Sequence, residues 1–264
     1  MSFLFRNPAP ALFVLPLALG LTGCFDMDVT INGEKGVPLS DLDLGGTAPV
    51  ELVLAASDNV ILTEGETLSI DVEGSDDAIA AVRFVLDDNT IGVTREEDFW
   101  DESDQATIRI TMPAPTEVVI TGSGNIEAQG LADDAQVSVL GSGSFTGGDT
   151  ELNSLDINIG GSGSAKFGTL TASTLEINLG GSGSVSASGG AERLELNLAG
   201  SGGANLSALK ADDADVTLAG SGSVRFQSDG AVDADIMGSG SVIVSGSATC
   251  TENAMGSGSL RCSG

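Results

Sequence analysis

The amino-acid sequence predicts an all-β protein, a parallel β-helix built from flattened coils of two strands each. Two observations predict this fold: a tripeptide that recurs at a nearly fixed period, and alternating apolar residues on both sides of it. Gly-Ser-Gly occurs eight times, in steps of 19, 20, 20, 19, 20, 18 and 18 residues. Such a period is typical of stacked solenoid coils. The first glycines of the copies are Gly122, Gly141, Gly161, Gly181, Gly200, Gly220, Gly238 and Gly256.

Apolar and polar residues alternate next to each tripeptide, as they do in strands that are buried on one face. Two positions before the copies stand Ile120, Val139, Ile159, Leu179, Leu198, Leu218, Ile236 and Ala254. Four positions after the first glycine stand Ile126, Phe145, Ala165, Val185, Ala204, Val224, Val242 and Leu260. Each period therefore contains two strands, joined at one end by Gly-Ser-Gly and at the other by a less regular turn. A flexible Gly/Ser linker, the alternative, does not carry phased apolar columns.

Residues 1–23 are predicted to be an export signal, because Arg6 precedes an apolar run that is too short to remain as a membrane span. The signal ends in Leu21-Thr22-Gly23-Cys24, which resembles the lipobox of bacterial lipoproteins. That resemblance implies that Cys24 becomes the first mature residue and carries the lipid that anchors the protein to a membrane. Phe25 rather than aspartate follows, so we expect an outer-membrane lipoprotein, facing the periplasm or the outside. An ordinary cleaved signal is the alternative.

Residues 24–47 are polar and without a clear pattern, and we expect a flexible tether there. Residues 48–121 contain strand-like runs without the tripeptide, separated by acidic turns such as Ser57-Asp58-Asn59 and Ser75-Asp76-Asp77. We predict irregular first coils that cap the repeat region, residues 122–264; a separate small β domain is the alternative. The acidic stretch from Glu96 to Asp104 is expected to be a surface loop.

Cys250 and Cys262 form an even pair in a chain with an export signal, where oxidation is expected. They lie six residues before and six residues after Gly256, on inward columns near the less regular turn. We therefore predict a disulfide that closes the last coils of the stack. The spacing does not match a metal site.

Composition excludes several function classes. The chain has 10 basic and 38 acidic residues and a net charge of −28, which repels nucleic acid and anionic lipid headgroups. It contains no histidine and no tyrosine, so the commonest general base is missing. We expect no cofactor and no catalysis. A polysaccharide-degrading enzyme is the alternative. Its site would need carboxylates beside basic residues in a cleft, but the outward face of the second strand of each coil offers only the scattered Lys166, Arg225 and Arg261.

Acidic residues also recur outward, five positions before successive tripeptides. They are Asp156, Glu176, Glu195, Asp215 and Asp233. Stacked carboxylates repel one another, and bound calcium would offset that repulsion, so we consider a candidate cation-binding face. The alternative, which we prefer, is a solvated acidic surface that keeps the sheet soluble. Asn158, Asn178 and Asn197 form a further column two residues on.

The lipoprotein signal, the extended β segment and the run from Met112-Pro113 through Val118-Val119-Ile120 into Gly122-Ser123-Gly124 resemble one bacterial family. That family is named putative auto-transporter adhesin, head GIN domain, and the resemblance covers most of residues 48–264. It implies a pectin-lyase-like β-helix without catalytic residues. We therefore expect a non-enzymatic, lipid-anchored protein of the cell envelope with a structural or adhesive role and a glycan or protein partner. A calcium- or glycan-binding surface module is the alternative.

Overall fold

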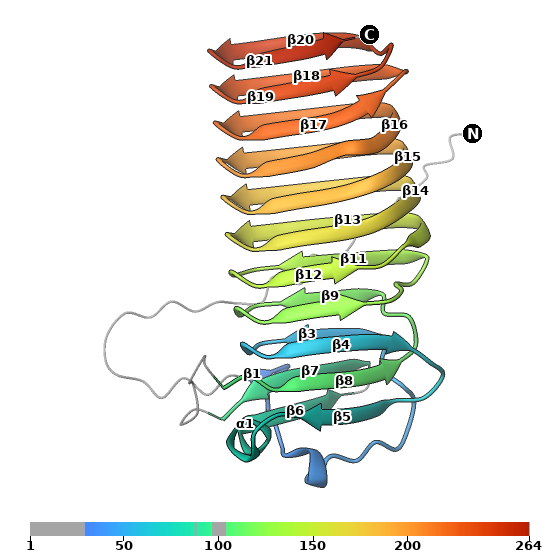
Figure 1. Ribbon diagram of the computed structural model, residues 1–264, viewed down its shortest axis with the longest axis vertical. Helices are drawn as coiled ribbons and strands as arrows, with labels where there is room; N and C mark the ends of the chain where they lie inside the picture. The colour runs from blue at the N-terminus through green and yellow to red at the C-terminus, as the bar shows by residue number, and fades with distance from the viewer. Residues whose placement is uncertain (1–29, 88, 97–103, 264) are drawn as a thin grey trace, which may run out of the picture.

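The computed structural model describes residues 30–87, 89–96 and 104–263. The expected export signal, Cys24 and most of the expected acidic loop lie outside the described residues. The molecule is an elongated stack of coils, with one strand of each coil on each side (Figure 1). Strands of successive coils pair in parallel through the whole repeat region. The predicted parallel β-helix is confirmed.

The repeat region begins where the coils become regular. Its strands are β9 (Glu117–Ile120), β10 (Asn125–Ala128), β11 (Asp134–Val139), β12 (Ser144–Gly147), β13 (Thr150–Gly161), β14 (Ser164–Gly181), β15 (Ser184–Gly200), β16 (Gly203–Gly220), β17 (Ser223–Ser228), β18 (Ala231–Gly238), β19 (Ser241–Ser245), β20 (Thr249–Gly256) and β21 (Ser259–Ser263). β14, β15 and β16 continue without a break around the corner opposite Gly-Ser-Gly, so the turn expected there is a bend within one strand.

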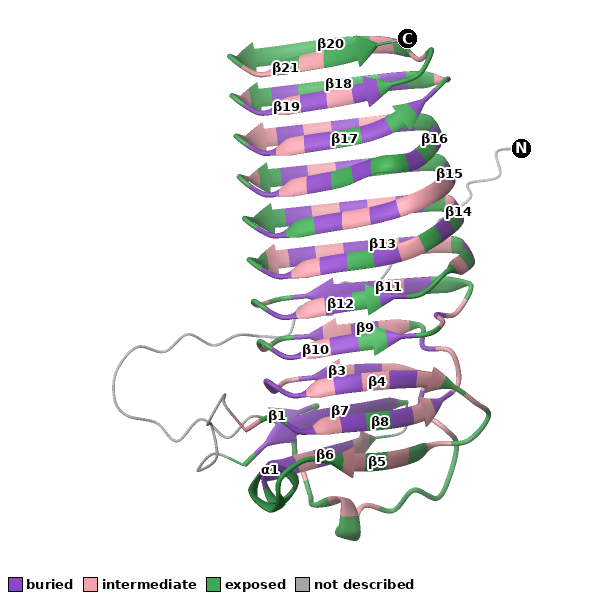
Figure 2. Ribbon diagram, in the orientation of Figure 1, coloured by how far each residue is buried: buried purple, intermediate pink, exposed green. Residues whose placement is uncertain are grey.

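The core is a thin layer between the two sheets, and burial alternates residue by residue along the strands (Figure 2). Ile157, Ile177 and Leu196 occupy neighbouring coils in exact register, and each is fully buried. On the opposite wall, the ring of Phe167 lies 5.3 Å from that of Phe145. The glycine in register with Phe167, Gly147, leaves the space that these two rings fill. The predicted apolar columns therefore form the core, since close packing of these side chains excludes water.

The Gly-Ser-Gly corners stack along one edge, backbone upon backbone. The carbonyl oxygen of Gly161 accepts hydrogen bonds from the amides of Ser182 and Gly183, at 2.9 and 3.1 Å. The same pair of bonds links Gly181 to the next corner. From Gly161 to Gly256 the first glycine of the corner has φ between +117° and +136°, a region that side chains other than hydrogen strongly disfavour.

The first coils are irregular, and they do not follow chain order. β3 (Glu51–Leu54) pairs with both β7 (Thr90–Arg95) and β9, while β4 (Asn59–Glu64) pairs with both β8 (Thr107–Met112) and β10. The coil β3–β4 thus lies between the coil β7–β8 and the repeat region. β5 (Ser69–Glu73) and β6 (Val82–Asp87) pair antiparallel with β8 and β7 and end the stack.

Two segments before the repeats differ from expectation. Ser75-Asp76-Asp77 is not merely a turn, because it begins the helix α1 (Asp76–Ala81), where the Ser75 hydroxyl accepts a hydrogen bond from the amide of Ala78. Asp58 is fully buried rather than exposed in an acidic turn. The Arg95 guanidinium donates two hydrogen bonds to its carboxylate, at 2.6 and 2.8 Å, and so compensates its charge.

The expected tether is docked over its described part, residues 30–47. It contains β1 (Thr30–Ile31), β2 (Glu34–Lys35) and the short 3-10 helix η1 (Leu39–Asp41). Ile31 is buried against Gly92, and Val37 exchanges two 2.8 Å backbone hydrogen bonds with Phe84. These contacts continue the antiparallel end of the stack, which is why this polar segment is not free in solution.

Candidate functional site

Parallel register turns the outward residues of successive coils into straight columns. On the face formed by β11, β13, β14, β15, β16 and β18, the five predicted acidic residues lie in one such column. We call Asp156, Glu176, Glu195, Asp215 and Asp233 the carboxylate column. Neighbouring coils are about 4.8 Å apart, so adjacent carboxylates are close enough to interact strongly.

The carboxylate column is only partly neutralised. Partial burial raises the pKa of Asp156, and the carboxylates of Glu176 and Glu195 raise it further. Arg193 pairs with Asp215, and the Asn178 side chain donates a 2.8 Å hydrogen bond to Glu176. The remaining members keep this part of the face negative.

The carboxylate column does not form a convergent metal site. In the parts of the chain that the structure describes, no three acidic or cysteine side chains are grouped so that they could hold a metal ion. The carboxylates follow one another in a line instead of surrounding a point, whereas calcium takes six to eight oxygen ligands.

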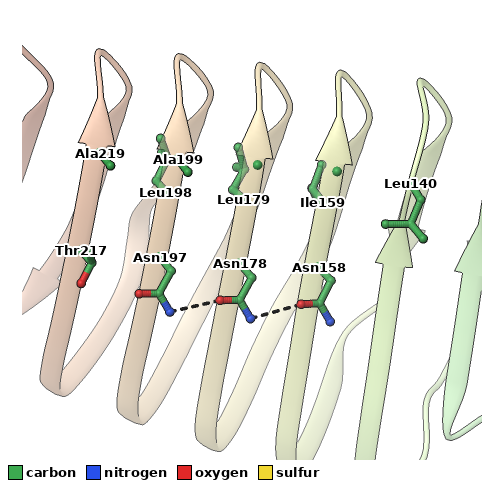
Figure 3. Close-up of a pocket in the computed structure, with 12 residues that line it drawn as sticks. Leu140, Asn158, Ile159, Asn178, Leu179, Asn197, Leu198, Ala199, Thr217 and Ala219 are labelled. Atoms are coloured by element: carbon green, nitrogen blue, oxygen red, sulfur yellow. Dashed lines mark hydrogen bonds between the residues drawn. The ribbon is translucent and has the colours of Figure 1, made fainter. Parts of the chain in front are cut away.

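The second column of this face contains three successive asparagines, Asn158, Asn178 and Asn197, followed by Thr217 (Figure 3). The Nδ2 of Asn178 donates to Oδ1 of Asn158, and the Nδ2 of Asn197 donates to Oδ1 of Asn178, both at 3.1 Å. Each amide is thereby held in one orientation by its neighbour. The result is a neutral, ordered strip beside the carboxylate column.

The third column, directly before each of the last seven Gly-Ser-Gly copies, is apolar, although it faces outward. Its members are Leu140, Gly160, Gly180, Ala199, Ala219, Met237 and Met255. The glycines and alanines form the floor of a groove of about 390 Å³, which the asparagine amides flank (Figure 3). Leu140, which is 53% exposed, lies at one end of the groove, and Met237, which is 44% exposed, follows Ala219 beyond the other end. We call this the apolar groove.

Sequence reasoning missed the apolar groove, although a signal was present. In strands that alternate strictly, apolar residues are expected in the inward phase, yet Leu140, Met237 and Met255 lie in the outward phase. A contiguous exposed apolar strip with polar residues along its rim is a recognised mark of an interaction surface.

The opposite outward face is mixed. Thr146, Lys166, Ser186, Asn205 and Arg225 succeed one another in a single column, and Arg261 continues it after Ile243. The basic residues are therefore separated from one another by neutral ones. From Thr146 to Arg261 this column contains no carboxylate, whereas glycoside cleavage uses a pair of them.

The two cysteines of the repeat region are joined. Cys250 in β20 and Cys262 in β21 form a disulfide, with their Cα atoms 6.7 Å apart. The predicted pairing is confirmed. In the same coil Glu252 stands at an inward position, in register with Ala234, and its carboxylate accepts a 2.9 Å hydrogen bond from the amide of Leu260.

A family model described as "Putative auto-transporter adhesin, head GIN domain" matches residues 48–248. The chain belongs to this family. The match covers the irregular first coils and most of the repeat region, including the carboxylate column and the apolar groove. No protein of curated function is detectably similar to the chain in sequence.

Solved structures share the fold of this head GIN domain protein. A protein from Parabacteroides distasonis, described as a "putative lipid binding protein", is 20% identical with a TM-score of 0.74, over 83% of this chain and 94% of its own. A "putative adhesin" from Parabacteroides merdae is 17% identical with a TM-score of 0.73, over 82% of this chain and 92% of its own. A "putative adhesin" from Bacteroides fragilis is 20% identical with a TM-score of 0.58, over 82% and 93%.

These descriptions refer to adhesion and lipid binding, not to catalysis. An adhesin-like family indicates a protein of the cell surface or envelope. Among the described residues, no helix is long and apolar enough to cross a bilayer.

Proposed function

We propose that this head GIN domain protein is a non-enzymatic lipoprotein of the cell envelope, anchored through Cys24, with an adhesive or structural role carried by its outward sheet faces. The observation that carries the proposal is the ordered outward face of the repeat region, where in-register columns present a continuous surface to a partner. The family description supports adhesion, and the lipobox supports the anchor. The Cys250–Cys262 disulfide fits an exported, oxidising location.

Metabolic labelling with a radioactive fatty acid tests the anchor. The wild-type protein should incorporate the label and remain in the membrane fraction, whereas Cys24→Ala should do neither. Label that persists in Cys24→Ala would show that Cys24 is not the lipidated residue.

Protease treatment of intact cells tests the adhesive role. An adhesin must be reachable from outside, so the protease should remove the domain, and cells lacking the gene should bind less to host surfaces or to one another. A domain that is fully protected in intact cells would contradict adhesion and would favour a structural role inside the envelope.

The cation-binding alternative rests on the carboxylate column alone. Titration calorimetry with calcium at low ionic strength tests it. Because the carboxylates do not converge, we expect neither heat of binding nor thermal stabilisation. A stoichiometric calcium signal that Glu176→Gln abolishes would establish the cation-binding alternative instead.

A further inference from the structure

The apolar groove and the carboxylate column are parallel features of one face, and both run along the solenoid axis. They lie four residues apart on each strand, or about 13 Å, with the asparagine column between them. From Leu140 to Ala219 the groove crosses four coil steps, or about 19 Å. A partner that uses both features must therefore present an aliphatic row and a cationic row side by side.

We propose that this face binds a basic amphipathic α-helix of another protein, lying along the solenoid axis with its aliphatic stripe in the apolar groove and its Lys or Arg residues over the carboxylate column. The inference rests on the proposed binding role and names the chemistry of the partner.

The spacing of the coils favours a helix over an extended chain. Side chains three and four positions apart on a helix face follow one another at about 5–6 Å, close to the coil spacing of about 4.8 Å. Alternate side chains of an extended chain follow at about 6.6 Å and lose register within a few coils. A helix diameter of about 10 Å, with the reach of a lysine side chain, spans the distance between groove and column.

Charge decides between this partner and others. Along β13–β16 and β18 the carboxylate column contains five acidic residues, and Asp235, in register with Thr217, adds another beside it. Anionic phospholipid and nucleic acid would be repelled. A second copy of this chain, with net charge −28, would place like charges opposite each other. The carboxylate column attracts a cationic partner, whereas it repels these anionic ones.

Gly180 gives a way to fill the groove without disturbing the fold. Its φ is not positive, and a Cβ placed there would meet nothing closer than the Ile159 carbonyl oxygen at 3.8 Å. Gly180→Leu should therefore fold and block the groove. Thr146→Leu, which adds the same side chain to an exposed strand position of the opposite face, is the matched control. Glu176→Gln with Glu195→Gln removes charge at nearly constant shape, with Glu127→Gln and Glu151→Gln as the charge-matched control.

The test measures fluorescence anisotropy of a labelled helical peptide of Leu and Lys, about 18 residues long so that it covers the groove at 1.5 Å per residue. The full chain should bind it, and a scrambled peptide of equal composition should bind much more weakly. Gly180→Leu should weaken binding by about tenfold or more, the cost of exposing one buried leucine, and Thr146→Leu should not. The Glu176/Glu195 double variant should weaken binding and reduce its salt dependence, while its control should do neither.

Other outcomes overturn the proposal. Equal binding of the scrambled peptide would show charge attraction alone, and equal binding by Gly180→Leu would show that the groove is not used. Absence of peptide binding would also reject the proposal. So would binding of zwitterionic phospholipid vesicles, or self-association in sedimentation, if Gly180→Leu abolished it. Peptide binding in solution is independent of the anchor and of exposure on cells, so this failure is distinguishable from failure of the proposed function.

Discussion

Two adjacent glycines in the same strand illustrate different demands on a single residue. Gly181 has φ +117°, and a Cβ there would overlap the carbonyl group of Gly161 in the neighbouring coil. Gly180 has neither constraint. The backbone therefore requires glycine at the corner, whereas the glycine before it only keeps the floor of the apolar groove low.

Alanine substitution separates these two demands. Gly181→Ala should lower the free energy of unfolding by about 1–3 kcal/mol or more, because both the dihedral strain and the overlap oppose it. Gly180→Ala should leave the free energy unchanged or raise it by up to about 1 kcal/mol, through the lower entropy of the unfolded chain. Urea unfolding followed by circular dichroism measures both, and equal losses would contradict the role given to the corner.

At the residue scale, the repeated tripeptide made the Gly-Ser-Gly corners predictable. The coil β3–β4 lacks the tripeptide, so the burial of Asp58 at its corner was not predicted. Ala56-Ser57-Asp58 occupies the place of Gly-Ser-Gly in the coil β3–β4, since the amide of Gly124 bonds to the Ala56 carbonyl at 3.0 Å. An aspartate is accommodated there because Arg95, 37 residues later, pairs with it in the interior, and the amide of Ala106 donates a further 2.8 Å hydrogen bond to it. Sequence alone does not reveal such a distant partner.

At the scale of elements, the carboxylate column makes stability depend on pH. Burial first, and then Glu176 and Glu195, raise the pKa of Asp156 above its ordinary value of 3.8. The folded state thus binds this proton more tightly than the unfolded state does. The resulting stabilisation is complete below the unfolded pKa and is lost as the pH rises through the folded pKa.

Removal of the Asp156 charge should therefore stabilise the fold at neutral pH. Asp156→Asn should raise the thermal midpoint near pH 7, and the gain should shrink toward pH 3, where the wild-type carboxyl is protonated. Differential scanning calorimetry across this range measures it, with Glu127→Gln on the opposite face as the control. A lower midpoint for Asp156→Asn near pH 7 would mean that the carboxylate stabilises the fold.

The strands were largely predictable, because alternation with period two shows them directly. The strand-like runs expected before the repeats correspond to β3 through β9. The helix α1 was not predicted, although Ser75 followed by two aspartates and an alanine-rich stretch is a typical helix beginning. Six residues are too few for a helical period to be visible against the surrounding strands.

At the scale of the whole molecule, the order of the first coils could not be predicted, because it depends on pairings between distant segments. The repeat coils are equivalent, whereas the coil β3–β4 links the irregular end to them. Loss of one repeat should therefore be tolerated, and loss of this link should not.

Two deletions test this difference. Removal of residues 181–199 joins Gly180 to Gly200 and keeps the period, so the shortened chain should fold with a similar circular dichroism spectrum and resistance to protease. Removal of residues 51–64 should abolish that resistance, because the strands β7 and β9 both lose their partner β3. Equal tolerance of both deletions would contradict the interleaved order of the coils.

Disulfide trapping tests the central claim, that successive coils stack in parallel register and align outward residues into columns. In the double variant Asn178→Cys with Asn197→Cys, the two cysteines face each other on adjacent strands. The strands are about 4.8 Å apart, which is within the Cα–Cα range for disulfide formation. In Asn178→Cys with Ser186→Cys, the two cysteines lie on opposite outward faces. Mass spectrometry after mild oxidation should find the first cross-link and not the second. A cross-link in the second pair without one in the first would contradict the stacked, in-register solenoid.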